Sequence, residues 1–302
     1  MSLLVTGSIG IDTIETPFGN PDDVVGGSAV YFSYAASFFA PVRLVGVIGP
    51  DYPHDLRKLF ASRDVDLTGL ETRQGSKSFR WHGSYVQNMN EAQTVAVDLN
   101  VLAEAAPKIP APFLDTTHVF LANTHPALQS QMIDALKSPR LIVADTMNLW
   151  IETTRNELLG LLKKIDGLVL NDGEARLLTG EKNMILASRK VLDLGPKFVV
   201  IKKGEHGSLM ASREDNEVFV LPAFPADRVV DPTGAGDSFA AGMMGYLATQ
   251  SHVSAGLVRR AMAYGTVVGS HPTGCVTPGG RPNAPGGAIE QRLAELGRVI
   301  RF

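Results

Sequence analysis

Short runs of apolar, largely β-branched residues recur along the chain, separated by stretches long enough for a helix. The runs are bounded by Gly or Asp and lack polar alternation, which is typical of strands buried on both faces. The predicted strands are Leu3 to Thr6, Arg43 to Val47, His118 to Leu121, Leu141 to Asp145, Gly167 to Leu170 and Phe198 to Lys202. Amphipathic segments predict helices at Ala29 to Phe39, Leu128 to Leu136, Glu152 to Ile165 and Met184 to Leu194. This alternation predicts an α/β fold, with a doubly wound, mostly parallel sheet flanked by helices.

The segment from Ser78 to Val97 has a different pattern, because Phe79, Trp81 and Tyr85 alternate with polar residues. This period of two predicts a small antiparallel β-hairpin. The hairpin could be a lid over a site on the main sheet, or an edge hairpin that packs or dimerises. We expect one domain over residues 1–302, with a β lid formed by about residues 12–25 and 71–98.

Composition and charge exclude several classes of function. Hydrophobic residues make up 44% of the 302 residues, charged residues make up 20%, and the net charge is −3. There is no basic excess for a nucleic-acid partner or a membrane surface, and no apolar run reaches the roughly 18 residues of a membrane span. The N-terminus lacks the basic region of a signal peptide. The single cysteine, Cys275, excludes an intramolecular disulfide, so we expect a cytoplasmic protein.

The string DPTGAGDSFAAG, from Asp231 to Gly242, carries the clearest chemistry. Its glycines permit a tight turn, and the residues that follow have the apolar spacing of a helix. N–H groups and the positive end of the helix dipole meet there, so Gly234, Ala235 and Gly236 could bind a phosphoryl group. Asp237 could accept a proton from a hydroxyl that attacks this group, or it could simply cap the helix.

The full string resembles the C-terminal signature of the ribokinase-like (PfkB) carbohydrate kinases. The resemblance implies that the γ-phosphoryl group of ATP is transferred to an alcohol in the presence of Mg²⁺. It implies that Asp237 is the general base, that Gly234 to Gly236 form the anion hole, and that Thr233 binds the nucleotide. It also extends to a monovalent-cation loop, which implies K⁺ at Asp231.

Segments near the N-terminus resemble the substrate-binding region of the same family. The resemblance implies that the acceptor hydroxyls are held by the following residues: Asp12, Gly26, Gly27 and Ser28. Tyr31 stands where sugar kinases often have asparagine, so an aromatic ring could pack there on a furanose or a base. Trp81 could do the same from the hairpin, and Asn123 is a further candidate because it ends a predicted strand.

Two later segments resemble the nucleotide side of the family's site. Asn171 and Glu174 fit the Asn-x-x-Glu motif, which implies that Glu174 positions Mg²⁺ through water, although the same pair could be a helix capping box. The turn from Lys202 to Gly207 resembles a phosphate-side loop, which implies nucleotide contacts from Lys203, Gly204 and Gly207. The last segment, Ala263 to Thr277, is similar to the region that closes over adenine.

These observations leave three functions open. The first is a carbohydrate kinase that phosphorylates a small sugar with ATP, and the second is a ribonucleoside kinase of the same family. The third is a non-catalytic sensor of sugars or nucleotides, against which Asp237 argues. All three bind small molecules, and a homodimer through the lid is a further prediction.

Overall fold

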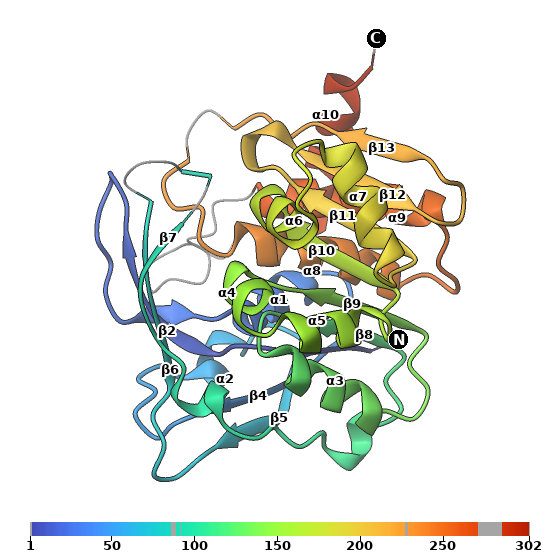
Figure 1. Cartoon of the computed structure of the whole chain (residues 1–302). Helices are drawn as coiled ribbons and strands as arrows, with labels where there is room; N and C mark the ends of the chain where they lie inside the picture. Colours follow the sequence, from blue (N-terminus) through green and yellow to red (C-terminus); the bar gives the residue numbers. More distant parts are fainter. Residues whose placement is uncertain (1, 86–88, 91, 227–228, 271–285, 302) are drawn as a thin grey trace.

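A nine-stranded sheet forms the centre of the computed structural model, which describes residues 2–85, 89–90, 92–226, 229–270 and 286–301. Its strands are β1 (Leu3–Thr6), β4 (Val42–Ile48), β5 (Val65–Thr72), β8 (His118–Leu121), β9 (Leu141–Asp145), β10 (Gly167–Asn171), β11 (Phe198–Lys202), β12 (Ser208–Ser212) and β13 (Val218–Leu221). Their order in the sheet is β13-β12-β11-β10-β9-β8-β1-β4-β5 (Figure 1). The β11–β12 and β12–β13 pairs are antiparallel, and the remaining pairs are parallel. All six strands predicted from the apolar runs are confirmed.

Helices cover both faces of this sheet, as a doubly wound fold requires. They are α1 (Ser28–Ala36), α2 (Leu56–Leu59), α3 (Pro126–Ala135), α4 (Asn148–Thr153), α5 (Arg155–Leu162), α6 (Asp172–Thr179), α7 (Met184–Asp193), α8 (Ala235–Ala248), α9 (Ala255–Gly269) and α10 (Gly286–Val299). Short 3₁₀ helices are η1 (Asn100–Ala103), η2 (Ala111–Phe113) and η3 (Gly204–His206). Leu3 and Val5 pack with the core that contains α1, α8 and α9, whereas Leu4 packs with the core that contains α3, α5 and α7. Alternate residues of β1 therefore pack against the helix layers on opposite faces of the sheet.

One predicted helix differs from the structure. The segment from Glu152 to Ile165 was expected to be continuous, but Thr154 has φ −134° and ψ 41° and separates α4 from α5. The Thr154 hydroxyl donates to the carbonyl oxygen of Trp150 at 3.1 Å. Threonine often makes such local hydrogen bonds to the backbone, which compete with regular helix geometry.

A second, four-stranded sheet stands at one end of the main sheet, on the left in Figure 1. It consists of β3 (Val24–Gly26), β2 (Gly10–Glu15), β6 (Phe79–Ser84) and β7 (Gln93–Asp98), in that order. The antiparallel β6–β7 pair confirms the predicted hairpin, and β2 joins it through a parallel pairing with β6. We call this sheet the small sheet. Residues 71–72, expected in the lid, belong to β5 of the main sheet.

The strand order of the main sheet reverses at β1, which lies between β4 and β8. Loops that leave neighbouring strands at such a point diverge, and a crevice opens at the carboxyl ends of the strands. Here the N–H of Ser8, just after β1, donates to the carbonyl oxygen of Asn123, just after β8, at 3.2 Å. Among the helices of the described ranges, none is long and apolar enough to cross a membrane.

Candidate active site

A cleft of about 1670 Å³ lies at the carboxyl ends of the main-sheet strands, between this edge and the small sheet. The main sheet contributes residues from the ends of β9, β10 and β11, and the first turn of α8 forms part of the wall. Phe79, Trp81 and Tyr85 line the cleft from the β6 side. The two sheets therefore bound one shared cavity that is large enough for two small molecules.

The glycine turn before α8 has the geometry of an anion site. Gly234 has φ 75° and the helix begins at Ala235, with no side chain capping its start. The N–H groups of the first turn are therefore available to an anion, apart from that of Ala235, which donates to Pro232 O at 3.0 Å. A Cβ on Gly234 would lie 2.5 Å from the Tyr31 ring, so both the backbone and the space require glycine.

Asp237 lies in this first turn and faces the cleft. Burial, and then repulsion by Asp145, raise its pKa to about 7, while Lys202 partly opposes the shift. A carboxylate with a pKa near neutral pH is a stronger proton acceptor than an exposed aspartate and is still ionised at slightly alkaline pH. Asp237 can thus act as a base toward a hydroxyl held in the cleft.

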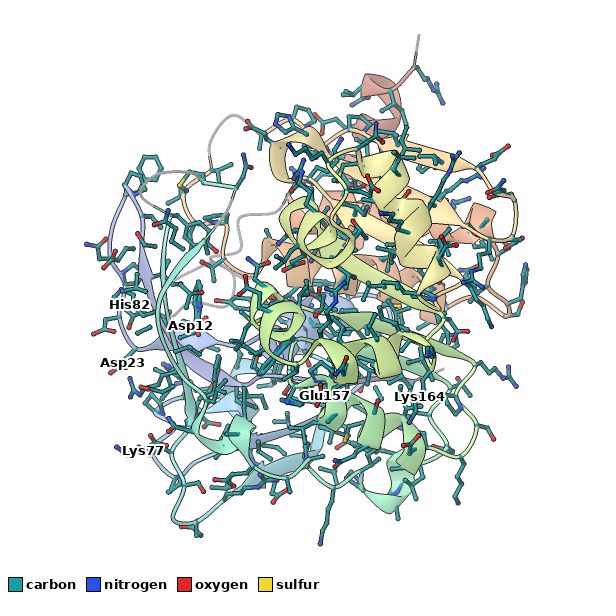
Figure 2. The ribbon with its side chains drawn as sticks, in the orientation of Figure 1. Asp12, Asp23, Lys77, His82, Glu157 and Lys164 are labelled. Carbon is teal, nitrogen blue, oxygen red and sulfur yellow. The ribbon has the colours of Figure 1, made fainter. Side chains whose placement is uncertain are left out.

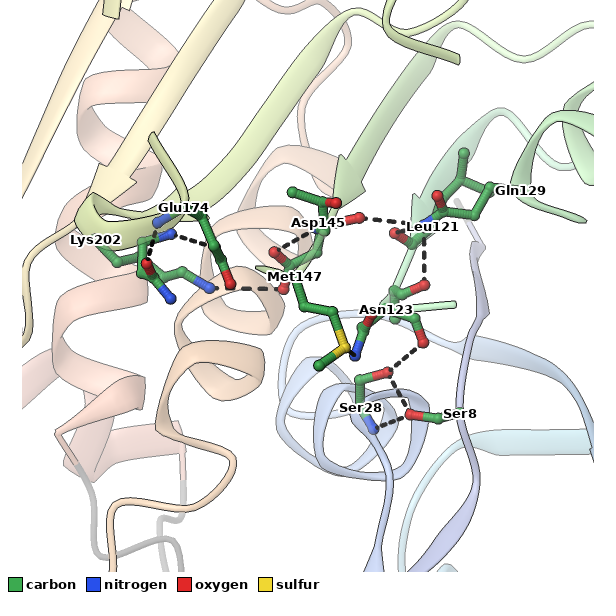
Figure 3. A network of polar contacts seen from close by, with 12 residues as sticks. Ser8, Ser28, Leu121, Asn123, Gln129, Asp145, Met147, Glu174 and Lys202 are labelled. Atoms are coloured by element: carbon green, nitrogen blue, oxygen red, sulfur yellow. Dashed lines mark hydrogen bonds and ion pairs between the residues drawn. The ribbon is translucent and has the colours of Figure 1, made fainter. Parts of the chain in front are cut away.

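Lys202, Asp145 and Glu174 form a charged cluster beside this turn (Figure 3). The Lys202 ammonium is 3.6 Å from Asp145 Oδ2, and the N–H of Thr146 donates to Asp145 Oδ1 at 2.9 Å. Burial works against the positive charge of Lys202, but attraction to Asp145, Glu174 and Asp237 raises its pKa overall. Gln129 Nε2 donates to the carbonyl oxygens of Leu121 and Asp145, which fixes the ends of β8 and β9.

Asn171 and Glu174 form the capping box that the sequence left as an alternative. The N–H of Glu174 donates to Asn171 Oδ1, and the N–H of Asn171 donates to Glu174 Oε2, both at 2.7 Å. Glu174 nevertheless lines the cleft, and burial followed by repulsion from Asp145 raises its pKa to about 8. The capping and site interpretations are therefore compatible, because the cap holds the carboxyl group at the wall of the cleft.

Asp12 lies at the other end of the cleft, on β2. In Figure 2 it lies closer to the main sheet than His82 does. A Cβ on Gly26 would be 2.0 Å from Asp12 Cγ, so this glycine makes room for the carboxyl group. Asp12 Oδ1 is buried and has no hydrogen-bond partner among the residues that the structure describes. Burial, and then repulsion by Asp237 and Asp231, raise the pKa of Asp12 to about 8.

Gly27 and Ser28 shape the same end of the cleft. Gly27 has φ 97°, and its N–H donates to Asp12. The Ser28 hydroxyl lies 2.9 Å from Ser8 Oγ, and the Ser28 N–H donates to Ser8 Oγ at 3.0 Å. These contacts join the end of β1 to the start of α1, which holds the turn beside Asp12.

The three other predicted acceptor residues line the cleft but use their polar groups within the protein. The Tyr31 hydroxyl donates to Val25 O at 3.3 Å, and Trp81 Nε1 donates to Thr94 Oγ1 at 3.2 Å. Asn123 Oδ1 accepts from Trp150 Nε1 at 2.8 Å. These side chains therefore offer rings and shape to a bound molecule more than free polar atoms.

The remaining predicted nucleotide residues divide into those that line the cleft and one that does not. Gly204, Gly207 and Thr233 line it. Within the described part of the chain, Lys202 lines the cleft and Lys203 does not, so a nucleotide contact from Lys203 stays a prediction. The predicted adenine segment is described only to Ser270, and its residues 271–277 lie outside the described residues.

Asp145 and Lys202 were missed by sequence reasoning, although both end strands that were predicted correctly. The signal was present, because the last residue of a buried parallel strand lies at the edge where α/β folds bind ligands. The sequence indicated an anion hole formed by backbone N–H groups and the helix dipole, without a lysine. The structure places the Lys202 ammonium beside this anion hole. A Cβ built on Gly236 would be 3.0 Å from Lys202 Nζ.

Comparisons with known proteins show similarity to a family of kinases. Residues 22–277 match the family model described as pfkB family carbohydrate kinase. A cytidine kinase from Thermococcus kodakarensis is 29% identical over 249 residues, which cover 81% of this chain and 87% of that protein.

Solved structures show the same fold. A Burkholderia thailandensis nucleoside kinase in complex with inosine has a TM-score of 0.72 and 18% identity, covering 97% of this chain and 98% of its own. A putative ribokinase II from E. coli in complex with ATP and Mg²⁺ has a TM-score of 0.72 and 20% identity, covering 99% and 98%. The chain belongs to the pfkB family carbohydrate kinases, and it is a phosphotransferase that acts on a hydroxyl group of a sugar or nucleoside.

Proposed function

We propose that this kinase transfers the γ-phosphoryl group of ATP to a hydroxyl of a ribonucleoside. The observation that carries the proposal is the pairing of two carboxyl groups in one cleft, the buried Asp12 and the half-buried Asp237. Asp12 has an unpartnered oxygen at one end, and Asp237 lies beside the glycine turn. A carboxylate can accept two hydroxyl hydrogens, so Asp12 suits a sugar ring, and Asp237 suits the hydroxyl that reacts.

Aromatic side chains around the acceptor end favour a nucleoside over a small sugar. Phe79, Trp81, Tyr85 and Trp150 all line the cleft, and the polar atoms of Trp81 and Trp150 are satisfied within the protein. Their faces are suited to stacking on a planar base, whereas a small sugar would leave them exposed to water. The similarity to a cytidine kinase supports the same choice.

The transfer follows from the positions of the chain's own groups. The acceptor hydroxyl attacks the γ-phosphorus, the bond to the β–γ bridging oxygen breaks, and Asp237 takes the hydroxyl proton. N–H groups at the start of α8 stabilise the charge on the transferred phosphoryl group. The products are the phosphorylated acceptor and ADP, and the proton passes from Asp237 to solvent when the cleft opens.

Glu174 fits the role of positioning Mg²⁺ through water. Among the residues with described positions, no group of three or more His, Cys, Asp or Glu side chains could hold a metal ion. Mg²⁺ would therefore depend on phosphate oxygens and water as well as on Glu174, which is its usual mode in kinases. When bound, Mg²⁺ neutralises phosphate charge. The nucleotide would contact Asn171, Gly204, Gly207 and Thr233, and K⁺ near Asp231 stays a prediction, as does a cytoplasmic location.

We infer that the small sheet acts as a lid over the acceptor. Asn90, between β6 and β7, contacts η3 on the opposite side of the cleft. Its Nδ2 donates to Glu205 Oε1 at 2.8 Å, and its Oδ1 accepts from the Glu205 N–H at 3.1 Å. This reciprocal pair would hold the lid to the nucleotide side and exclude water during transfer.

The lid proposal can be tested by removing the contact. Asn90→Ala and Glu205→Ala should each raise the acceptor KM and increase ATP hydrolysis in the absence of acceptor. The double variant should be no worse than Asn90→Ala alone, because Asn90→Ala already removes both hydrogen bonds. Glu157→Ala, at an exposed position of α5, serves as the control. Additive effects of the two changes would contradict a shared contact.

A homodimer through the small sheet is a separate proposal. Strand β7 forms one edge of that sheet and exposes Val95 by 55% and Val97 by 38%. A strand edge with exposed apolar side chains is a surface on which a second copy could add a strand. Sedimentation of the wild type and of Val95→Lys tests it. A monomeric wild type would exclude the dimer.

The acceptor itself is tested by turnover with ATP and Mg²⁺ over a panel of ribonucleosides and small sugars. We expect a ribonucleoside to have the highest kcat/KM, and Trp81→Ala to lower it more for nucleosides than for free ribose. A free sugar with higher kcat/KM than every nucleoside would overturn the nucleoside assignment. A chain that binds both ligands without turnover would be a sensor.

A further inference from the structure

The ammonium of Lys202 occupies a place in the cleft to which the sequence prediction assigned no role. Lys202 is the last residue of β11, in register with Asn171 on one side and with Ser208 on the other. Its side chain is 18% exposed, and its Nζ would be 3.0 Å from a Cβ on Gly236. The positive charge therefore lies against the glycine turn at the start of α8.

The contact with Asp145 does not account for this position. The distance of 3.6 Å exceeds the 2.7–2.9 Å typical of a charge-assisted hydrogen bond. An ammonium has three donors, and the described contacts leave donor capacity for a further acceptor. On the same side, Ser208 Oγ is buried without a hydrogen-bond partner among the described residues, although Ser208 lines the cleft.

The carboxyl groups around Lys202 are only partial counter-ions. Asp145, Glu174 and Asp237 all attract Lys202, but each of the three carboxyl groups is also shifted toward its neutral form by burial. A phosphoryl group at the start of α8 would be the strongest acceptor within reach of the ammonium. Lysine binds phosphate as a point charge, without the fixed geometry that arginine requires.

We propose that Lys202 is a catalytic residue whose ammonium contacts the phosphoryl group being transferred, beside the N–H groups of the Gly234–Gly236 turn. This assignment rests on the proposed site of transfer. Lys202 stays protonated throughout, so the bonds made and broken and the proton taken by Asp237 are unchanged. Its charge stabilises the negative charge carried by the oxygens of the γ-phosphoryl group during transfer.

The test uses Lys202→Met, with Lys202→Gln and Lys202→Arg measured beside it. We expect Lys202→Met to lower kcat by about 100-fold, the usual effect of losing one donor to developing charge, with Lys202→Arg recovering part of the loss. Affinity for a non-hydrolysable ATP analogue should fall by about 10-fold while affinity for ADP is retained, because only the γ-phosphoryl group meets the ammonium. A purely structural lysine would change both affinities alike.

The control is Lys197→Met, directly before the first residue of β11, where the lysine is 76% exposed and pairs with Asp166 at 2.7 Å. It should leave kcat and both affinities unchanged. The proposal would be overturned if the ratio of the affinity for the ATP analogue to the affinity for ADP were the same in Lys202→Met as in the wild type. Failure of both Lys202→Met and Lys202→Gln to fold would also overturn it. If Asp237→Asn keeps wild-type turnover, the proposed site of transfer is wrong; if it is inactive while Lys202→Met is normal, only the assignment of Lys202 fails.

Discussion

Asp237→Asn separates the cost of Asp237 to stability from its contribution to catalysis. The amide has almost the same shape as the carboxyl group but cannot accept the hydroxyl proton. Loss of a general base typically lowers the rate by about 10²–10⁴-fold, so kcat should fall within that range. Binding of ATP should persist, because the backbone N–H groups of the glycine turn are unchanged.

The effect on stability follows from the raised pKa of Asp237. Burial and Asp145 raise this pKa from 3.8 to about 7, and each unit corresponds to about 1.4 kcal/mol. The folded state therefore holds the proton more tightly than the unfolded state does. The contribution of the Asp237 proton to the free energy of unfolding is fully present below the pKa that Asp237 has in the unfolded chain, and it is lost as the pH rises through about 7. The loss is at most about 4 kcal/mol, since water in the cleft screens part of the charge.

The asparagine variant has no charge to bury, so its stability relative to the wild type should grow with pH. Between about pH 5.5 and pH 8 the gain should be about 2 kcal/mol, and above that it should be constant. Urea unfolding of the ligand-free proteins at both pH values measures it, with Asp134→Asn as the control because Asp134 is 63% exposed and pairs with Lys164. A gain independent of pH would refute the argument from burial.

Three further predictions concern the same cleft. Gly234→Ala should lower the free energy of unfolding by more than the roughly 1–2 kcal/mol cost of a left-handed residue, because its Cβ also meets the Tyr31 ring; urea unfolding tests this, and an unchanged midpoint would contradict it. Asp12→Asn should raise the acceptor KM by about 10-fold or more with ATP affinity unchanged; isothermal titration with each ligand decides. The kcat/KM of the wild type should rise with pH through about 7, as Asp237 loses its proton, and a flat profile between pH 5 and pH 8 would exclude Asp237 as the base.

The main sheet was predictable because its parallel strands are buried on both faces. Strands such as β8 and β9 are apolar at nearly every position, which separates them clearly from the helices between them. Strands β5, β12 and β13 were not predicted. Strand β12 (SLMAS) is buried, but it has serine at both ends and no β-branched residue. Strands β5 and β13 are partly exposed and form the two edges of the sheet. An edge strand has one neighbour and a weaker apolar requirement, so its pattern is harder to recognise.

The small sheet was only partly predictable for a similar reason. The alternation of Phe79, Trp81 and Tyr85 indicated β6, because these residues face the cleft while their neighbours face solvent. Strand β7 is exposed at every position, so no apolar face marks it. The parallel pairing of β2 with β6 joins segments about 70 residues apart, which no local pattern specifies.

Some features of the candidate site follow from the local sequence, and others depend on the folded sheet. Local turn chemistry specified the glycine turn, the capping box of Asn171 and Glu174, and the position of Asp237. The charge balance depends instead on the ends of β9 and β11 and on the first turn of α6, where Asp145, Lys202 and Glu174 meet only after the sheet has formed. A shift of one residue decides whether a side chain at the end of β11 enters the cleft, so Lys202 and Lys203 could not be separated by composition.

Several carboxyl groups in one cleft lower the stability of the folded protein, and this cost argues that the cleft binds a ligand. Asp12, Asp145, Glu174 and Asp237 all have pKa values raised by burial, so a stable empty protein would gain from replacing them with neutral residues. Among the described residues, the buried acidic residues Asp12, Asp145 and Glu174 all line this cleft, whereas the other buried polar residues are Ser, Thr, Gln and His. A cluster that violates the pattern at the carboxyl edge of a parallel sheet is therefore best explained by the reaction that those groups perform.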